Sequence, residues 1–259
     1  MSDFLAKGWC VLPHDARVKT WAEAAWLAGQ KAMRSPTLAQ WWVCENTWFV
    51  GVDALNNTAD GSIDGVPLQG APVETVIQLY GEVPALHPAQ LSVVTPGYPK
   101  PREGESAAAF GYRLKRDAAH VDGLKRGADG ARYLEEAHAW IMGMPLTTNA
   151  IEEAPLVVWD GSHQIMREAL GQALAKYDPK DWPTIDITAV YQAARKQVFE
   201  TCERIEICAQ PGQSFLLHRL SAHGVAPWQT GQTTQSDLRA IAYFRPAIIG
   251  ELSRWFSLG

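Results

Sequence analysis

The stretch KRDAAHVDGL, residues 115–124, places His120 two positions before Asp122. On a β-strand, residues two apart lie on the same face, so one imidazole and one carboxylate would point into the same cavity. Such a pair also arises by chance, as an exposed strand end. A third ligand from a distant strand would complete a facial triad, which holds a metal ion from one side and leaves the other side open.

The stretch PGQSFLLHRLSAHGVAPW, residues 211–228, offers that third ligand. The proline–glycine pair at its start predicts a turn, and the apolar run from Ser214 to His218 predicts a strand. His223 follows in a Ser-Ala-His-Gly segment that is typical of a strand end over a cavity. We expect His223 to be the third ligand. His218 is the alternative, although a histidine inside a strand more often belongs to the core or to a cavity wall.

Two arginines stand on the last predicted strand, in SDLRAIAYFRP at residues 236–246. Arg239 lies sixteen residues after His223, and Arg245 is six residues further on with the same strand parity. A guanidinium beside a metal centre suits a bidentate pair with a carboxylate. We expect Arg239 to fill that role, with Arg245 as the alternative.

The residues just before the His-x-Asp pair are also charged or aromatic. Tyr112, Arg113 and Arg116 are predicted to lie on a strand that leads into the pair. Any of them can bind an anion, and a solvated charged edge is an equally good interpretation. The preceding segment 98–111 is rich in proline, glycine and charge, and we predict a loop that acts as a lid.

The rest of the chain alternates short strands with few helices. Helices are predicted at residues 15–33, 163–176 and 187–204. Strands are predicted at residues 8–13, 75–81, 90–97, 112–120, 134–148, 155–161, 204–210, 214–220 and 238–248, with irregular chain from about residue 41 to 70. This order, with no Gly-x-Gly-x-x-Gly or Walker loop, favours a mainly β fold with flanking helices, a jelly roll. No linker divides residues 1–259, so one domain is expected.

Composition excludes several classes of protein. Apolar residues make up 47% of the chain and the net charge is −5, so no nucleic-acid partner is expected. The four cysteines form no Cys-x-x-Cys pair, no signal peptide begins the chain, and no apolar stretch is long enough for a membrane span. We therefore expect a cytoplasmic protein. Eleven tryptophans fill a core, and the cluster Trp41, Trp42 and Trp48 is placed to wall a pocket.

The sequence resembles the phytanoyl-CoA dioxygenase family of iron(II)- and 2-oxoglutarate-dependent oxygenases. The shared features, in chain order, are GWCVLP near the start, His120-Val-Asp122, Gly-Ser-His at 161–163, Pro-Gly before a strand, and then His223 and Arg239. The resemblance implies a double-stranded β-helix core of the cupin-like type. It also implies that His120, Asp122 and His223 bind iron(II) and that Arg239 binds the C5 carboxylate of 2-oxoglutarate.

The resemblance further implies the reaction. Oxygen and 2-oxoglutarate are consumed, succinate and CO2 are released, and a small-molecule substrate is hydroxylated. Tyr112 and Arg245 are additional candidates for contacts with 2-oxoglutarate, Tyr112 at its C1 end. Two alternatives stay open: a metal-dependent cupin-like enzyme that does not use 2-oxoglutarate, and a non-catalytic jelly-roll binding protein. Adjacent Ser162 and His163 also suggest a nucleophile–base pair, but sequence neighbours rarely hold that geometry.

Overall fold

Two antiparallel sheets form the centre of the computed structural model, which describes residues 2–229 and 236–256. The large sheet has the strand order β1-β10-β7-β12-β4-β3-β2, and the small sheet has the order β11-β8-β9. The strands of the large sheet are β1 (Trp9–Leu12), β2 (Trp42–Val43), β3 (Trp48–Phe49), β4 (Gln90–Val94), β7 (Trp140–Pro145), β10 (Ser214–His218) and β12 (Arg239–Phe244). Those of the small sheet are β8 (Leu156–Trp159), β9 (Arg204–Ile207) and β11 (His223–Val225), and β5 (Leu124–Arg126) pairs with β6 (Arg132–Leu134) as a separate hairpin.

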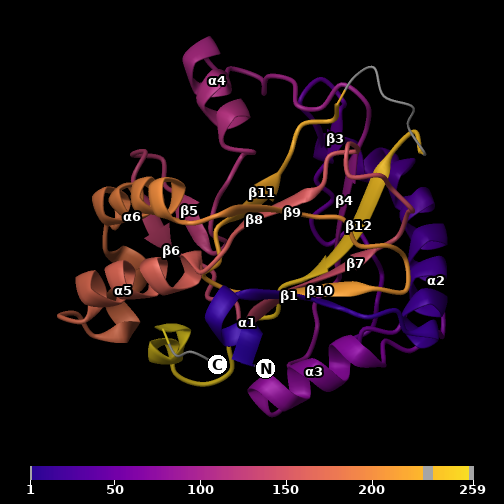
Figure 1. Cartoon of the computed structure of the whole chain (residues 1–259), viewed down its shortest axis with the longest axis horizontal. Coiled ribbons are helices and arrows are strands. Elements are labelled where there is room, and N and C mark those ends of the chain that lie inside the picture. Colours follow the sequence, from indigo (N-terminus) through magenta and orange to yellow (C-terminus); the bar gives the residue numbers. More distant parts are fainter. Residues whose placement is uncertain (1, 230–235, 257–259) are drawn as a thin grey trace.

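Helices flank the sheets, with α2 and α3 beside the large sheet and α5 and α6 beside the small one, whereas α4 stands apart (Figure 1). They are α1 (Ser2–Lys7), α2 (Ala16–Met33), α3 (Ala71–Tyr80), α4 (Ala107–Lys115), α5 (Ser162–Leu174) and α6 (Thr188–Thr201), with 3-10 turns η1 (Pro36–Trp41), η2 (Pro179–Thr184) and η3 (Leu252–Phe256). Over the ranges that the structure describes, no helix combines the length and the apolar character needed to cross a membrane.

Strand parity sorts the apolar side chains into layers. On β7, Trp140, Met142 and Met144 belong to the core between the large sheet and helices α2 and α3. The neighbouring Ile141 belongs to the core between the two sheets, together with Leu156 of the small sheet. A third core fills the space between the small sheet and helices α5 and α6. Because β7 is buried on both faces, its sequence is continuously apolar rather than alternating.

One glycine on β7 is required by the packing between the sheets. A Cβ at Gly143 would lie 1.9 Å from Cζ of Phe215 on the paired strand β10. The Phe215 ring therefore occupies the space that any side chain at position 143 would need. This close approach keeps the inter-sheet space filled next to the cavity described below.

Most of the predicted elements are confirmed, including the helices at 15–33, 163–176 and 187–204 and the strands β1, β4, β7, β8, β9, β10 and β12. The short strands β2 and β3 lie in the segment 41–70, which was expected to be irregular. Two predicted strands are wrong. Residues 75–81 lie in α3, where Pro72 occupies the first turn and Val76 is buried. Residues 112–115 lie in α4, whose start is capped by Ser106, which accepts a hydrogen bond from the backbone N–H of Ala109. In α3, the proline in the first turn and the burial of Val76 outweigh the strand-like composition, and in α4 the Ser106 cap does so.

Candidate metal centre

His120 and Asp122 follow α4 on a loop rather than on a long strand. Asp117 and Ala118 both have positive φ, 51° and 55°, and they turn the chain back toward the small sheet. His120 then pairs with His223 of β11 as a single antiparallel bridge, through reciprocal backbone hydrogen bonds of 2.9 and 3.0 Å. The expected placement of the two ligands on one face is thus achieved by one bridge at the edge of the small sheet.

Gly224 allows this loop to approach β11 closely. A Cβ at position 224 would lie 2.1 Å from the carbonyl oxygen of Asp117, and the next residue, Val225, donates its backbone N–H to that same oxygen at 2.8 Å. The Asp117 carboxylate in turn accepts two hydrogen bonds from Arg204 of β9, at 2.6 and 3.1 Å. Backbone pairing and this ion pair together hold the loop that carries His120.

Helix α6 supports the same loop from the other side. The hydroxyl of Tyr191 accepts a hydrogen bond from the backbone N–H of Val121 at 3.2 Å. Nη2 of Arg195 donates to the carbonyl of Ala119 at 2.9 Å. The residues on either side of His120 are therefore fixed by two side chains of one helix.

The three ligand atoms converge on one point. His120, Asp122 and His223 each offer one atom, and these atoms lie within 4.8 Å of one another. Nε2 of His120 lies 3.2 Å from Oδ1 of Asp122, and Nε2 of His223 lies 3.8 Å from the same oxygen. Two imidazole nitrogens and one carboxylate oxygen at this spacing fit a single transition-metal ion.

The remaining ring nitrogens fix the orientation of both histidines. Nδ1 of His120 lies 3.1 Å from the carbonyl of Ala118, and Nδ1 of His223 lies 3.0 Å from the carbonyl of Ser221. A carbonyl only accepts, so each Nδ1 carries the proton and each Nε2 keeps its lone pair free for a metal. The two backbone carbonyls therefore favour the Nδ1–H tautomer of each neutral imidazole, which is the tautomer that coordination through Nε2 needs.

Charge and burial suit the same purpose. Burial lowers the pKa of His223 to about 4, which keeps its imidazole neutral near neutral pH. Burial raises the pKa of Asp122, but the close contact with the His120 ring and the positive charge of Arg245, whose Nη1 lies 3.2 Å away, outweigh that effect. The pKa of Asp122 is therefore held well below its ordinary value, and the site presents a carboxylate.

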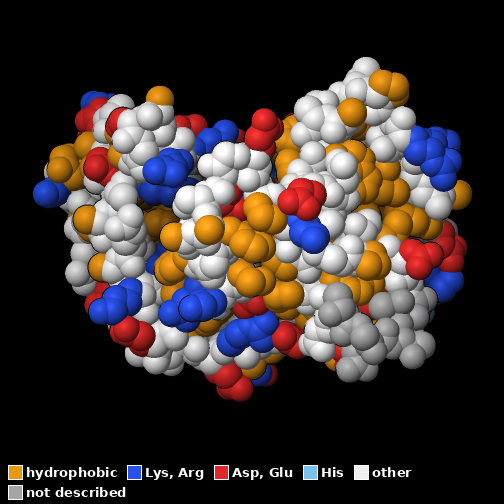
Figure 2. All heavy atoms as spheres, turned by 90° about the horizontal axis from the view of Figure 1, so that it is seen from above, with side chains coloured by type: hydrophobic (Ala, Val, Ile, Leu, Met, Phe, Trp, Pro, Cys, Tyr) orange, Lys and Arg blue, Asp and Glu red, His pale blue; other side chains and the backbone are white. Residues whose placement is uncertain are grey.

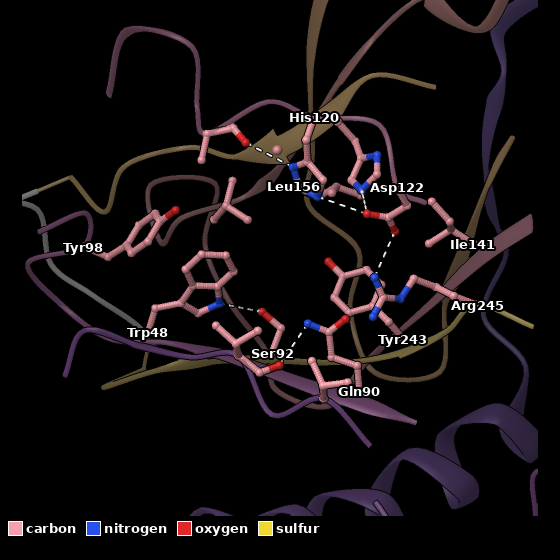
Figure 3. A pocket seen from close by; sticks show the side chains of 16 residues that line it. Trp48, Gln90, Ser92, Tyr98, His120, Asp122, Ile141, Leu156, Tyr243 and Arg245 are labelled. Atoms are coloured by element: carbon pink, nitrogen blue, oxygen red, sulfur yellow. Dashed lines mark hydrogen bonds and ion pairs between the residues drawn. The ribbon is translucent and has the colours of Figure 1, made fainter. Parts of the chain in front are cut away.

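The ligands open into a cavity of about 200 Å³ between the two sheets (Figure 3). Its far wall is mostly apolar and aromatic. Polar side chains on this wall form hydrogen bonds with other residues of the wall. Nε1 of Trp48 donates to Oγ of Ser92 at 3.0 Å, and Nε2 of Gln90 donates to the carbonyl of Val50 at 2.9 Å. The cavity is lined by Trp48, Val50, Val52, Gln90, Ser92, Tyr98, Ala118, His120, Asp122, Ile141, Leu156, His223, Gly224, Val225, Tyr243 and Arg245.

The two predicted arginines take different positions on β12. Nη1 of Arg245 lies 3.2 Å from Oδ2 of Asp122, so Arg245 lines the metal cavity and is already paired. Arg239 is buried at the other end of the strand, beside a small neighbouring cavity. Both Nη atoms of Arg239 lack a hydrogen-bond partner among the described residues. Burial raises the pKa of Tyr243, which lines the metal cavity, and the positive charge of Arg239 acts against that shift.

The structure does not bring Tyr112 into the metal cavity. The residue lies on α4, not on a strand, and it is 55% exposed. It lines an outer groove that reaches the metal ligands from the side of α4. The tryptophan cluster is divided in a similar way, because Trp48 lines both spaces, Trp41 lines only the outer groove, and Trp42 packs against Phe49.

His218 and His163 are held by contacts outside the triad. His218 is fully buried, its Nδ1 accepts the backbone N–H of Leu220, and its ring lies 4.9 Å from that of His163. Ser162 next to His163 accepts the backbone N–H of Ala222, which ties the start of α5 to the turn before β11. These residues have structural contacts, and His223 rather than His218 joins the metal ligands.

Several supporting residues were missed by sequence reasoning. Asp117 and Arg204 are eighty-seven positions apart, and no local pattern connects them. Gly224 reads as an ordinary loop glycine until the carbonyl of Asp117 is placed beside it. The cavity walls supplied by Ser92 and Tyr243 follow from strand register, in which β4 and β12 are neighbours. The sequence signal for these residues is weak, and the nearest to one is the position of Gly224 directly after a predicted ligand.

Comparison with known proteins supports the fold. No family model and no curated protein matches this chain. The crystal structure of EctD from S. alaskensis with bound Fe superposes with a TM-score of 0.50 at 16% identity, over 94% of this chain and 74% of EctD. The structure of the non-heme alpha ketoglutarate dependent carbocyclase SnoK from nogalamycin biosynthesis superposes with a TM-score of 0.49 at 10% identity, over 95% of this chain and 82% of SnoK.

These similarities define a class of protein. At such identity, the likeness to EctD shows a shared fold and nothing finer. The chain is a mainly antiparallel β protein with flanking helices and a His-Asp-His metal-binding triad. Membership of the phytanoyl-CoA dioxygenase family stays a prediction.

Proposed function

We propose that this protein is an iron(II)- and 2-oxoglutarate-dependent oxygenase of the phytanoyl-CoA dioxygenase family, with a double-stranded β-helix core, that hydroxylates a small molecule. One observation carries the proposal. The ligand atoms of His120, Asp122 and His223 converge within 4.8 Å, and both imidazoles are held at Nδ1 by backbone carbonyls, so that each Nε2 faces the carboxylate of Asp122.

The donor set favours iron(II). Two imidazoles and one carboxylate bound from one side of a metal form the arrangement typical of non-haem iron oxygenases. The opposite side here faces the cavity, which gives room for a cosubstrate and oxygen. When bound, iron(II) supplies the activation of oxygen that couples oxidation of 2-oxoglutarate to succinate and CO2 with hydroxylation of the substrate.

Arg239 is the proposed partner of the C5 carboxylate of 2-oxoglutarate. Both Nη atoms of this buried guanidinium lack a partner among the described residues, and an anion would supply one, because an unpaired buried charge is costly. Its side chain lies on the same face of β12 as Tyr243, whose ring lines the metal cavity. Tyr243 is then placed to contact the same carboxylate, between Arg239 and the metal.

Arg245 has a different proposed role. It is a positioning residue, because its Nη1 contacts Oδ2 of Asp122 and leaves Oδ1 facing the two imidazoles. The carbonyl of Arg245 accepts from Nε2 of His87 at 3.1 Å, which adds a backbone tether. This assigns the paired arginine to the metal ligand and the unpaired one to the cosubstrate.

The state of the cysteines supports a reducing compartment. Cys10, Cys44, Cys202 and Cys208 are all free thiols. We therefore place the enzyme in the cytoplasm, where thiols stay reduced.

The test combines spectroscopy with product analysis. Iron(II) and 2-oxoglutarate are added without oxygen, and a weak charge-transfer band in the visible region is expected. Air is then admitted, and succinate is measured. His120→Ala and Asp122→Ala should lose both responses, whereas the exposed His14→Ala should retain them. Absence of both the band and succinate in the wild-type protein would refute the proposal.

A further inference from the structure

A second, larger space opens next to the metal ligands. This outer groove has a volume of about 640 Å³ and shares Trp48, His120, Asp122 and Arg245 with the inner cavity. The side chain of His120 is 45% exposed on this side. Figure 2 shows the face of the molecule on which α4 lies, where Lys and Arg side chains stand around apolar ones. The groove therefore gives a substrate direct access to the ligand atoms.

The groove is rich in positive charge. Its cationic lining residues are Arg102, Arg113, Arg116, Lys125, Arg132, Arg195 and Arg245, whereas its carboxylates are Asp122 and Glu136. The chain as a whole has a net charge of −5, so the positive charge of the groove has the opposite sign to the net charge of the protein. A local excess of one charge in a groove attracts ligands of the opposite charge.

Three of these cations already have carboxylate partners. Arg113 pairs with Glu105 at 2.7 Å, Lys125 pairs with Glu136, and Arg245 pairs with Asp122. Both carboxylates of the groove lining are thereby neutralised. No ion pair within 4.0 Å joins a described carboxylate to Arg116, Arg132, Arg195 or Arg102.

Three of these arginines, Arg116, Arg132 and Arg195, lie against the aromatic rings of Tyr191 and Phe199. Arg116 lies 4.5 Å from the ring centroid of Phe199, Arg132 lies 5.8 Å from that of Tyr191, and Arg195 lies 5.4 Å from both. One Nη of Arg132 donates to a backbone carbonyl at 2.8 Å, as one Nη of Arg195 does at 2.9 Å. These contacts orient the guanidiniums without neutralising them, so their remaining donors are available to a ligand.

The other side of the groove is aromatic. Trp41 and Trp48 line it, and the guanidinium carbon of Arg102 lies 5.7 Å from the Trp48 ring centroid. One guanidinium can form a bidentate pair with one carboxylate, so three unpaired ones match an anion with more charge and more acceptor oxygens. A phosphoryl dianion has these properties, and the tryptophans suit a flat or apolar body attached to it.

We propose that the outer groove is the prime-substrate site and that Arg116, Arg132 and Arg195 bind a phosphoryl group on the substrate. The body of the substrate lies against Trp41 and Trp48, which brings a carbon toward the metal ligands. This inference rests on the proposed oxygenase function, because it names the substrate class of the same site.

The test measures binding of small probes by calorimetry. The protein is loaded with iron(II) and 2-oxoglutarate without oxygen, at low salt, and is titrated with phenyl phosphate, benzoate or benzyl alcohol. We expect phenyl phosphate to bind most tightly. Arg116→Gln should weaken it about tenfold, since a charge-assisted hydrogen bond is lost. Arg132→Gln should act in the same direction, and Arg116→Lys should recover part of the affinity. Thermal melting checks that each variant is folded.

The matched control is Arg34→Gln, which removes the same charge from an exposed residue at the end of α2 that does not line the outer groove. Phenyl phosphate should bind this variant as it binds the wild type. If Arg34→Gln weakens the binding of phenyl phosphate as much as Arg116→Gln does, the effect comes from the overall surface charge, and the proposal is overturned. Tighter binding of benzoate would overturn the phosphoryl assignment. The oxygenase proposal is tested separately by succinate release from the wild type, so the two failures are distinguishable.

Discussion

Gly224→Ala is the sharpest test of how the metal centre is assembled. The new Cβ would lie 2.1 Å from the carbonyl oxygen of Asp117 and 3.1 Å from the backbone nitrogen of Ala119. Ordinary contact begins at 3.4 Å, so β11 and the ligand loop must separate by more than an ångström. Both obstructing atoms belong to the backbone, and the ion pair of Asp117 with Arg204 prevents the loop from retreating freely.

The expected magnitude follows from the contacts that are broken. Separation removes the hydrogen bond from Val225 to Asp117 and the two that pair His120 with His223. At about 1 kcal/mol each, the free energy of unfolding should fall by about 3 kcal/mol. A change in the support of metal ligands typically lowers metal affinity by about 10- to 100-fold, and we expect a loss in that range.

The assay is nickel(II) binding by calorimetry, together with urea unfolding of the metal-free protein. Gly111→Ala is the matched control, because a Cβ at that position in α4 meets nothing within 4 Å. It should bind nickel like the wild type and be slightly more stable, since alanine is the better helix former. If Gly224→Ala is destabilised yet binds nickel with wild-type affinity, the bridge between the ligand loop and β11 does not position the ligands.

Three further predictions test other parts of the structure. Arg204→Gln leaves the buried carboxylate of Asp117 without its bidentate partner, and because Arg204 is itself partly exposed, we expect a loss of about 1–2 kcal/mol in urea unfolding. Arg239→Met should raise the KM for 2-oxoglutarate about 10- to 100-fold in a succinate assay, whereas Arg245→Met should chiefly weaken metal binding; the reverse pattern would exchange their roles. Burial lowers the pKa of His163 from its ordinary 6.5, so the unfolded chain takes up a proton below that pH while the folded chain does not. Stability should therefore fall as the pH drops from about 7 to about 5, and His163→Gln should flatten that slope in urea titrations.

Local patterns in the sequence were sufficient for most elements and failed where capping decided the outcome. Alternation and apolar runs predicted β4, β8, β10 and β12, because buried strands select for those residues directly. The same residue types at 75–81 and 112–115 form helices instead. There, Pro72 in the first turn of α3 and the Ser106 cap of α4 determine the backbone, and a composition-based prediction underweights both.

The candidate ligands were within reach of the sequence, but their assembly was not. The His-x-Asp pair and a later histidine can be recognised in the sequence, because these residue types in this order match the ligand set of a facial triad. The distances between them depend on the bridge from His120 to His223, on the space left by Gly224 and on the buried pair of Asp117 with Arg204. These contacts join residues about ninety to a hundred positions apart.

The roles of the arginines also depended on tertiary structure. Arg239 and Arg245 have the same strand parity, so parity does not separate them, although the family resemblance favoured Arg239. Only the fold pairs Arg245 with Asp122 and buries Arg239 with both Nη atoms unpaired among the residues that the structure describes. Likewise, Arg116, Arg132 and Arg195 are scattered over three segments and become one cationic wall when α6 packs beside the metal loop. The sequence by itself determined which side chains were available for the chemistry. The tertiary structure decided which of the charged side chains have an ion-pair partner among the described residues and which do not, because electrostatic pairing depends on distance in space and not on separation along the chain.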